Sequence, residues 1–346
     1  MKPTFTGAVT SERALLEAAR GGDEEAFRRL VEPRRAELHA HCYRMLGSVH
    51  DAEDALQDAL LRAWRGLRGL EERSTLRTWL YKIATNTSLD AIARRPKRVL
   101  PMDYEPPRQD GAEGEPVLAS VWVEPYPDEL VGLEDGYAAP DARYEQREAV
   151  ELAFIAALQH LAPRQRAVLI LREVLGFSAR EVADALDSTP ASVNSALQRA
   201  RKAIDERLPD RSQQATLREL GDERVRDLVE RFTAAFEQGE VDAILGMLAE
   251  DATFSMPPYP SWARGRDAVG RSWLMPGGPV PRLRYVRTRA NGQLATAAYL
   301  RDPLGGSYFP IALDVLTLRG EEIVEVIAFR DPEVFGRFGL PEELPG

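Results

Sequence analysis

The stretch SAREVADALDSTPASVNSALQRARKAI, residues 178–204, contains two helix starts separated by a short turn. Ser178 and Glu181 have the spacing of a capping box, and Thr189 followed by Pro190 supplies an N-cap with proline at the first helical position. The second helix has one apolar stripe, formed by Val193, Leu197, Ala200 and Ile204. This pattern predicts a helix-turn-helix. An ordinary helical hairpin with a solvated charged face is the alternative that this stretch alone leaves open.

The charge of the chain is unevenly distributed. The net charge is −10, yet residues 1–98 carry 18 Lys and Arg against 14 Asp and Glu, which is net +4. Residues 99–149 carry 3 against 13, net −10, and are rich in proline and glycine, which is typical of a linker. Residues 150–213 carry 9 against 8, net +1. The helical parts are therefore neutral or basic and can approach a polyanion.

The acidic linker contains one apolar segment, VWVEPYPDELVGL. We expect Trp122, Tyr126 and Leu130 in this segment to dock, with the C-terminal domain as their partner, and the acidic part to lie against cationic faces as a phosphate mimic. The alternative is a disordered spacer whose charge only aids solubility.

Two further helices are predicted before the linker. In DAEDALQDALLRAWR the apolar positions form one face, and the opposite face bears Asp51, Asp54 and Asp58. In STLRTWLYKIATNTSLDAIARR the buried face is predicted from Leu76, Leu80, Ile83, Thr87 and Ala91, and a second stripe holds Trp79, Lys82, Asn86, Asp90 and Arg94. An aromatic, an amide and cations on one face favour single-stranded nucleic acid.

The C-terminal third is predicted to be α+β. A helix over residues 222–238 precedes runs rich in β-branched and aromatic residues, and Asn291-Gly292 and Arg319-Gly320 mark hairpin turns.

Cysteine and hydropathy patterns exclude several classes of protein. The single cysteine, Cys42, excludes an internal disulfide framework. His39 and His41 beside it suggest zinc, but no fourth ligand is evident and Cys42 is better explained as a small buried side chain, so we expect no metal and no cofactor. No apolar run is long enough to span a membrane and the N-terminus lacks a signal peptide, so we expect a cytoplasmic protein with no membrane partner.

Taken together, residues 10–211 resemble an extracytoplasmic-function sigma factor of the bacterial sigma-70 family. DAEDALQDALLRAW resembles region 2.2, STLRTWLYKIATNTSLDAIARR regions 2.3 and 2.4, and LAPRQRAVLILREVLGFSAREVADALDSTPASVNSALQRARKAI region 4. The segments DATFSMPPYPSWARGRDAV and VLTLRGEEIVEVIAFRDPEVFGRFGLP are similar to the SnoaL-like cone domain. The implied fold is multidomain: an all-α region 2 domain at 1–98, the acidic linker at 99–145, an all-α region 4 domain with the helix-turn-helix at 146–211, and an α+β SnoaL-like regulatory domain at 212–346.

The resemblance also implies partners, namely the RNA polymerase core, through its β′ clamp helices and β flap, and promoter DNA. The residues expected at the clamp helices are Asp51, Asp54, Gln57 and Asp58. The residues expected at the minus-ten element are Asn86, which captures a flipped base, with Trp79, Lys82 and Arg94 nearby. The residues expected at the minus-thirty-five element are Asn194, Ser195 and Arg199 on bases and Ser178, Arg180 and Arg201 on phosphates. Many relatives have a basic residue in place of Asn194, so the preferred sequence cannot be carried over. A two-domain repressor that acts without polymerase is the rival interpretation.

For the C-terminal domain we expect a regulatory role, with an unknown small ligand as a further partner, and no enzymatic activity. The alternative is a small-molecule-binding or isomerase/cyclase-like enzyme domain tethered to a DNA-binding protein. Candidate acids are Asp251, Asp267, Asp314 and Asp331, and candidate lining residues are Tyr259, Trp262, Trp273, Tyr299 and Phe309. The four histidines, His39, His41, His50 and His160, all lie outside this domain, so an Asp/His pair is unavailable there.

Overall fold

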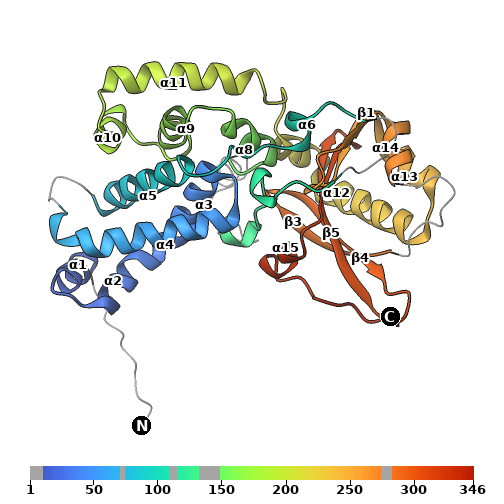
Figure 1. The fold of residues 1–346 in the computed structure, drawn as a ribbon, viewed down its shortest axis with the longest axis horizontal. Helices are drawn as coiled ribbons and strands as arrows, with labels where there is room; N and C mark the ends of the chain where they lie inside the picture. Colours follow the sequence, from blue (N-terminus) through green and yellow to red (C-terminus); the bar gives the residue numbers. More distant parts are fainter. Residues whose placement is uncertain (1–10, 71–74, 109–114, 132–148, 274–282) are drawn as a thin grey trace, which may run out of the picture.

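The computed structural model describes residues 11–70, 75–108, 115–131, 149–273 and 283–346 (Figure 1). Two groups of helices lie at one end and a twisted sheet lies at the other, and the linker runs between them. The first helical group comprises α1 (Glu12–Arg20), α2 (Glu24–Val31), α3 (Arg35–Leu46), α4 (Val49–Gly66) and α5 (Leu76–Ile92). None of the helices in these ranges has the length and apolar character of a membrane span.

The helix starts of the first group follow from their capping residues. The Ser48 hydroxyl accepts a hydrogen bond from the backbone N–H of Asp51 at the start of α4, and Thr75 does the same for Thr78 at the start of α5. On α5 the buried set is Leu76, Leu80, Tyr81, Ala84, Thr85, Thr87 and Ser88. The predicted Ile83 and Ala91 are only half-buried, because the contact face of α5 turns toward α3 and α4.

The second helical group comprises α8 (Leu152–Gln159), α9 (Pro163–Leu169), α10 (Ala179–Ala185) and α11 (Pro190–Asp205). The predicted capping box is present: the Ser178 hydroxyl accepts from the Glu181 backbone N–H at 3.2 Å, and the Glu181 carboxylate accepts from the Ser178 N–H at 2.8 Å. Thr189 caps α11, whose predicted apolar stripe is buried. The helix-turn-helix prediction is confirmed.

The sheet domain comprises α12 (Gln213–Gln238), α13 (Val241–Met247), β1 (Leu248–Ser255), β2 (Trp262–Arg264), α14 (Arg266–Trp273), β3 (Leu283–Ala290), β4 (Gln293–Arg301), β5 (Tyr308–Arg319), β6 (Glu322–Phe329) and α15 (Pro332–Arg337). The strand order is β2-β1-β6-β5-β4-β3, and only the β1–β6 pair is parallel among these strands. The predicted helix at 222–238 begins earlier, at Gln213, because Ser212 caps a preceding turn and Gly221 joins two helical pieces with non-helical angles.

Both predicted hairpin turns are confirmed. Ala290 pairs with Gln293 and Arg319 pairs with Glu322. Asn291 and Gly292 have φ values of 56° and 70°, the left-handed conformation that a two-residue hairpin turn requires.

The two faces of the sheet have different partners. On one face, Leu294 and Leu316 pack against Phe232 and Phe236 of α12. On the other face, Ala297, Tyr299 and Leu313 belong to the same apolar core as the two helical groups. The sheet domain is therefore packed into the helical part and is not an independent appendage.

The described part of the linker crosses this junction. Val99 accepts a hydrogen bond from the Val123 N–H at 3.0 Å and donates to the Val121 carbonyl at 2.9 Å, so the start of the linker pairs with its middle. Short helical turns, α6 (Pro101–Tyr104), η3 (Ala119–Val121) and η4 (Asp128–Val131), complete it. The expectations for residues 109–114 and 132–148 lie outside the described residues.

Candidate functional site

The acidic face of α4 is the first of three faces that carry the predicted site residues. Asp54, Gln57 and Asp58 are exposed, and Leu61, one turn further along, is 53% exposed. Asp51 differs from the expectation. It is 4% exposed and its carboxylate is paired with Arg95 and, at 2.8 Å, with Arg98. Arg95 and Arg98, which follow the end of α5, lie beside the first turn of α4, so the Asp51 side chain is held inward.

The second face is the predicted aromatic and cationic stripe of α5. Its Trp79, Lys82 and Asn86 side chains are half-buried and line an open groove of about 910 Å³. The opposite wall of the groove is α10 of the second helical group. The Lys82 ammonium donates to the Asp184 carbonyl at 2.8 Å, and the Asn86 amide donates to the Ala185 carbonyl at 3.4 Å.

Arg94, predicted on the same stripe, lies elsewhere. It is exposed near the end of α5 and lines a small pocket with Asp54, Gln57 and Asp58. The structure therefore brings Trp79, Lys82 and Asn86 together but not Arg94, because Arg94 follows the end of α5, beside α4.

The third face is the outer side of α11. Asn194, Ser195 and Arg199 are exposed there. Arg201 is also exposed and pairs with Glu173 at 2.8 Å. Ser178 and Arg180 lie at the start of α10 and line the groove that contains Trp79. The residues expected on one DNA element are thus divided between the α11 face and the groove.

Comparisons with known proteins find relatives of the two helical groups and of the sheet domain. The chain matches the families described as Sigma-70 region 2 at residues 30–98, Sigma-70, region 4 at residues 145–204 and SnoaL-like domain at residues 229–326. The ECF RNA polymerase sigma factor SigG of Mycobacterium tuberculosis is 42% identical over 329 residues, covering 94% of this chain and 86% of the relative. The chain belongs to the extracytoplasmic-function (ECF) sigma factors. It is an alternative sigma factor that directs promoter-specific transcription initiation, and it carries a SnoaL-like domain.

Other relatives match the same parts of this ECF sigma factor. The ECF RNA polymerase sigma factor SigW of Bacillus subtilis is 28% identical over 193 residues, covering 55% of this chain and 92% of the relative. The crystal structure of the Mycobacterium tuberculosis extracytoplasmic function sigma factor SigJ has a TM-score of 0.57 and 21% identity, covering 90% of this chain and 98% of that one. It shares the fold of helical sigma domains followed by an α+β domain. Sigma factors bind the polymerase core and promoter DNA, and they are not enzymes.

The predicted docking residues of the linker fall into two classes, and the Tyr126 side chain packs on α3 of the first helical group, where the C-terminal domain was the expected partner. Trp122 is 3% exposed and Tyr126 is fully buried, whereas Leu130 is 39% exposed. The Tyr126 hydroxyl lies 2.7 Å from Nδ1 of His39 in α3. The centroid of the Tyr126 ring lies 4.3 Å from the centroid of the Tyr43 ring, which is also on α3. Leu130 takes no comparable position, because η4 turns its side chain toward solvent.

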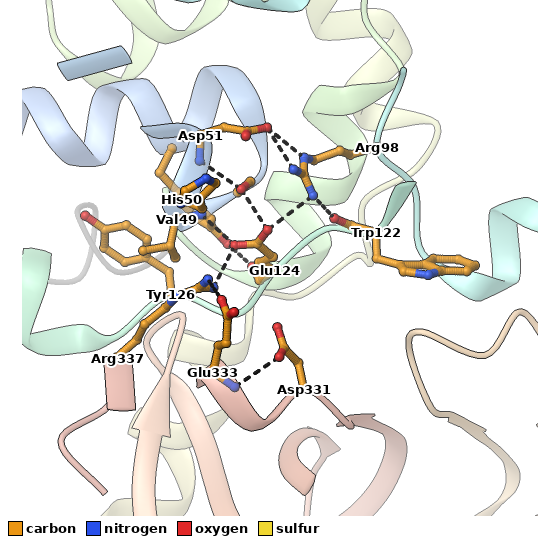
Figure 2. Close-up of polar contacts among 12 residues, drawn as sticks. Val49, His50, Asp51, Arg98, Trp122, Glu124, Tyr126, Asp331, Glu333 and Arg337 are labelled. Carbon is orange, nitrogen blue, oxygen red and sulfur yellow. Dashed lines mark hydrogen bonds and ion pairs between the residues drawn. The ribbon is translucent and has the colours of Figure 1, made fainter. Parts of the chain in front are cut away.

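Glu124, between these aromatics, joins three parts of the chain (Figure 2). Its carboxylate accepts hydrogen bonds from the Ser48 hydroxyl at 2.8 Å and the Val49 N–H at 3.0 Å. It also pairs with Arg98 at 3.3 Å and with Arg337 of α15 at 3.1 Å. Burial lowers the pKa of Arg98, and the nearby Glu124 carboxylate opposes that shift. The start of α4, the linker and the sheet domain therefore meet at one carboxylate.

Asn291, at the tip of the β3–β4 hairpin, makes the second junction and is fully buried. Its side-chain amide donates to the Tyr43 hydroxyl at 2.8 Å and to the Val150 carbonyl at 2.7 Å, and its side-chain oxygen accepts from the Tyr126 N–H at 2.8 Å. We call these four residues the Asn291 junction. Sequence reasoning found Asn291 only as a turn residue. Neither it nor Glu124 was predicted as an interdomain contact, because the local pattern carries no such signal.

The candidate acids of the sheet domain also differ from one another. Asp251 is exposed and paired with Arg319, Asp267 is exposed, and Asp331 caps α15 through the Glu333 N–H. Asp314 on β5 is 8% exposed, and burial raises the pKa of its carboxyl to about 7. Opposite it on β4, the Thr296 hydroxyl is buried without a described hydrogen-bond partner.

The aromatic residues predicted to surround such an acid do not converge on Asp314. Tyr299 belongs to the core on the other face of the sheet, Phe309 is 41% exposed, and the Trp262 indole donates to the Glu105 carbonyl in the linker. Tyr259 lies under Arg330, and the side chain of Trp273 is outside the described residues. Tyr285 is the aromatic near Asp314: burial and this carboxyl raise the pKa of its hydroxyl. The alternation of residues along β4 explains the error for Tyr299.

The His39, His41 and Cys42 group is an interior cluster. His41 lies 2.8 Å from the Thr85 hydroxyl, and burial lowers the pKa of its imidazole to about 3. Cys42 is fully buried. Within the described ranges, no three His, Cys, Asp or Glu side chains are arranged to hold a metal ion.

Proposed function

We propose that this ECF sigma factor exists in a closed arrangement, with α10 packed on α5, in which its minus-ten face is covered. In the open form, Asp54, Gln57 and Asp58 bind the β′ clamp helices, and Asp51 supports the start of α4 through Arg98. The region 4 domain approaches the β flap. Asn86 captures a flipped minus-ten base, with Trp79 for stacking and Lys82 for phosphate contact. Asn194, Ser195 and Arg199 contact minus-thirty-five bases, and Ser178, Arg180 and Arg201 contact phosphates.

The observation that carries the proposal is the contact between the α5 stripe and α10. Asn86 and Lys82 donate to carbonyls near the end of α10, so the groups needed for a base and a phosphate are engaged within the chain. The Thr78 hydroxyl and Glu181 carboxylate are 3.4 Å apart across the same interface. A single strand can reach this stripe only after α10 has moved away.

The linker and the sheet domain stabilise this arrangement. Glu124 joins α4 to α15, and the Asn291 junction joins α3 to the start of the second helical group. Among the described acidic residues of the linker, Glu124 acts through these specific contacts. Core polymerase, or a ligand of the sheet domain, can open the chain only by binding the open form more tightly than the closed one.

Run-off transcription tests the proposal. Purified core polymerase, a genomic promoter pool and the full chain should give specific transcripts, and the Asn291→Ala variant should give more. A repressor acting without polymerase would give no transcript in either case. Removal of residues 212–346 is a poor substitute, because Ala297, Tyr299 and Leu313 share the core of the helical groups and their loss would expose apolar surface.

A second candidate function for the sheet domain is the binding of a small molecule, and Asp314 favours it. The buried carboxyl has a pKa of about 7, so near neutrality it can donate a hydrogen bond to a ligand carbonyl or hydroxyl. An isomerase- or cyclase-like activity would also use such a group. Native mass spectrometry of the full chain tests ligand binding: a bound mass that disappears in the Asp314→Ala variant would support it, and an unloaded chain would count against it.

A further inference from the structure

The three faces described above are not equally covered in the closed arrangement. In Figure 1, α11 lies at the outer edge of the molecule, with α9 and α10 between it and α5. The buried stripe of α11 packs inward on α9, so the opposite side of α11 remains exposed. The α10–α5 contact uses the inner side of the second helical group and leaves the outer side free.

The outer side of α11 has unengaged hydrogen-bonding groups. Within the described ranges, no hydrogen bond or ion pair involves the side chains of Asn194, Ser195 or Arg199, and all three are exposed. The nearby carboxylate of Glu173 is paired with Arg201. An amide, a hydroxyl and a guanidinium on one exposed helix face are the groups that recognise base edges in a major groove.

The acidic face of α4 is also available in the closed chain. Asp54, Gln57 and Asp58 are exposed, and the half-exposed Leu61 adds an apolar contact on the same face. The Asp54 carboxylate has two long contacts, 3.5 Å to Arg95 and 3.8 Å to His50. Of the three faces, the α5 stripe is therefore the one whose Lys82 and Asn86 side chains are engaged by another helix of the chain.

We infer that closure blocks one of the two DNA-binding faces and leaves the other available. The closed chain binds duplex minus-thirty-five DNA through α11 without polymerase, and it binds single-stranded minus-ten DNA through α5 only after α10 leaves α5. This inference rests on the proposed roles of the two faces. It also orders recognition, with duplex DNA or polymerase bound first and the unpaired strand last. Because α11 is exposed in both forms, duplex DNA binds both equally and does not open the chain.

Selection from two random libraries tests the inference with the full chain and no polymerase. From duplexes with a randomised centre, the wild-type chain should enrich one sequence class, and Arg199→Ala should lower affinity for it by about 10-fold. From single-stranded oligonucleotides, the wild-type chain should enrich nothing. The Asn291→Ala variant should enrich a single-stranded class that Asn86→Ala in the same background loses, while its duplex affinity changes by less than about 2-fold.

A matched surface variant and a second opening variant serve as controls for the selections. Glu321→Ala changes an exposed residue at the other hairpin turn and should behave like the wild type in both selections. If Asn291→Ala does not fold, as judged by circular dichroism, Arg337→Met removes the Glu124 pair instead.

Two results would overturn the inference. One is a wild-type chain that enriches no duplex, and the other is an opened variant that gains duplex and single-stranded affinity together. Both results concern DNA binding without polymerase. Run-off transcription with core polymerase tests the proposed sigma function separately.

Discussion

The side-chain amide nitrogen of Asn291 lies 2.8 Å from the hydroxyl oxygen of Tyr43, which connects the β3–β4 turn of the sheet domain to α3 of the first helical group. Both residues are fully buried. The same amide also reaches the Val150 carbonyl, so one side chain joins three segments far apart in the sequence. Buried polar groups that lose their partner are costly, which makes this turn a point where the closed arrangement can be broken.

The Asn291→Ala substitution should weaken the closed arrangement. It leaves the Val150 carbonyl and the Tyr126 N–H without their partner, at about 1–3 kcal/mol for each unsatisfied buried group. We expect a larger radius of gyration by small-angle scattering and stronger run-off transcription. Glu321→Ala, at the exposed turn of the other hairpin, should leave both measurements at the wild-type value. A variant that stays compact and transcribes no better would show that the junction does not hold the chain closed.

The Glu124–Arg337 pair should contribute to closure through charge. We expect Glu124→Gln and Arg337→Met each to lower the free energy of unfolding. The double variant should lose less than the sum of the two single losses, with a coupling free energy of about 0.5–3 kcal/mol, which urea unfolding of the four proteins measures. Because both side chains are only partly buried, raising the salt concentration should reduce the coupling. The exposed pair of Arg224 with Glu321 is the matched control and should show a smaller coupling. Equal couplings for the two pairs would contradict a special role for Glu124.

Local sequence signals predicted much of this fold. The capping box at Ser178, the cap at Thr189 and the turn at Asn291-Gly292 all act within a few residues, so each was visible in the sequence and each is present in the structure. The alternation along β4 was also present in the sequence. It was nevertheless missed for Tyr299, whose place on the far face of the sheet depends on what covers that face.

The interdomain contacts could not be predicted in the same way. Glu124 is one of many acidic residues in its segment, and only the fold places it beside Arg98 and Arg337. Asp51 has the same helical spacing as Asp54 and Asp58, yet it is buried because the end of α5 brings two arginines to the start of α4. Such pairings join residues distant in sequence and leave no periodic pattern.

Asn86 and the acidic face of α4 should be separable by mutation. Asn86→Ala should impair promoter opening more than polymerase binding, because Asn86 lies on α5 and is the residue proposed to capture the flipped minus-ten base. Charge reversal of Asp54 and Asp58 to lysine should impair polymerase binding first, because these exposed residues form the acidic face. Co-precipitation with core polymerase and permanganate footprinting measure the two steps. Identical defects in both variants would show that the two faces do not have separate partners.

Arg199→Ala should weaken recognition of the minus-thirty-five element. The guanidinium is exposed on the outer side of α11, and a base contact of this type contributes about 1–3 kcal/mol. Fluorescence anisotropy with the selected duplex measures the loss. Arg224→Ala, which removes an exposed arginine from the sheet domain, should leave the affinity unchanged. A loss that is the same for every duplex sequence would indicate a phosphate contact instead of a base contact.

The stability of the chain should depend on pH through Asp314. Burial raises the pKa of its carboxyl from 3.8 to about 7 in the folded chain. Well below pH 3.8 the group is protonated in both the folded and the unfolded state, and it has no charge to desolvate. As the pH rises toward 7, the unfolded state loses this proton while the folded state retains it, so the free energy of unfolding falls; above pH 7 both states are ionised and the loss is complete.

The Asp314→Asn variant removes this titration while nearly preserving the side-chain volume. Its free energy of unfolding, relative to the wild type, should therefore rise between pH 4 and pH 7 and level off above that range, by about 1.4 kcal/mol for each unit of pKa shift as an upper bound. Urea unfolding at several pH values measures the difference. Asp251→Asn is the control: Arg319 lowers the pKa of that exposed carboxyl, so its contribution is present above pH 4 and is lost as the pH falls. A difference between the wild type and Asp314→Asn that is constant from pH 4 to pH 8 would mean that Asp314 does not hold its proton in the folded chain.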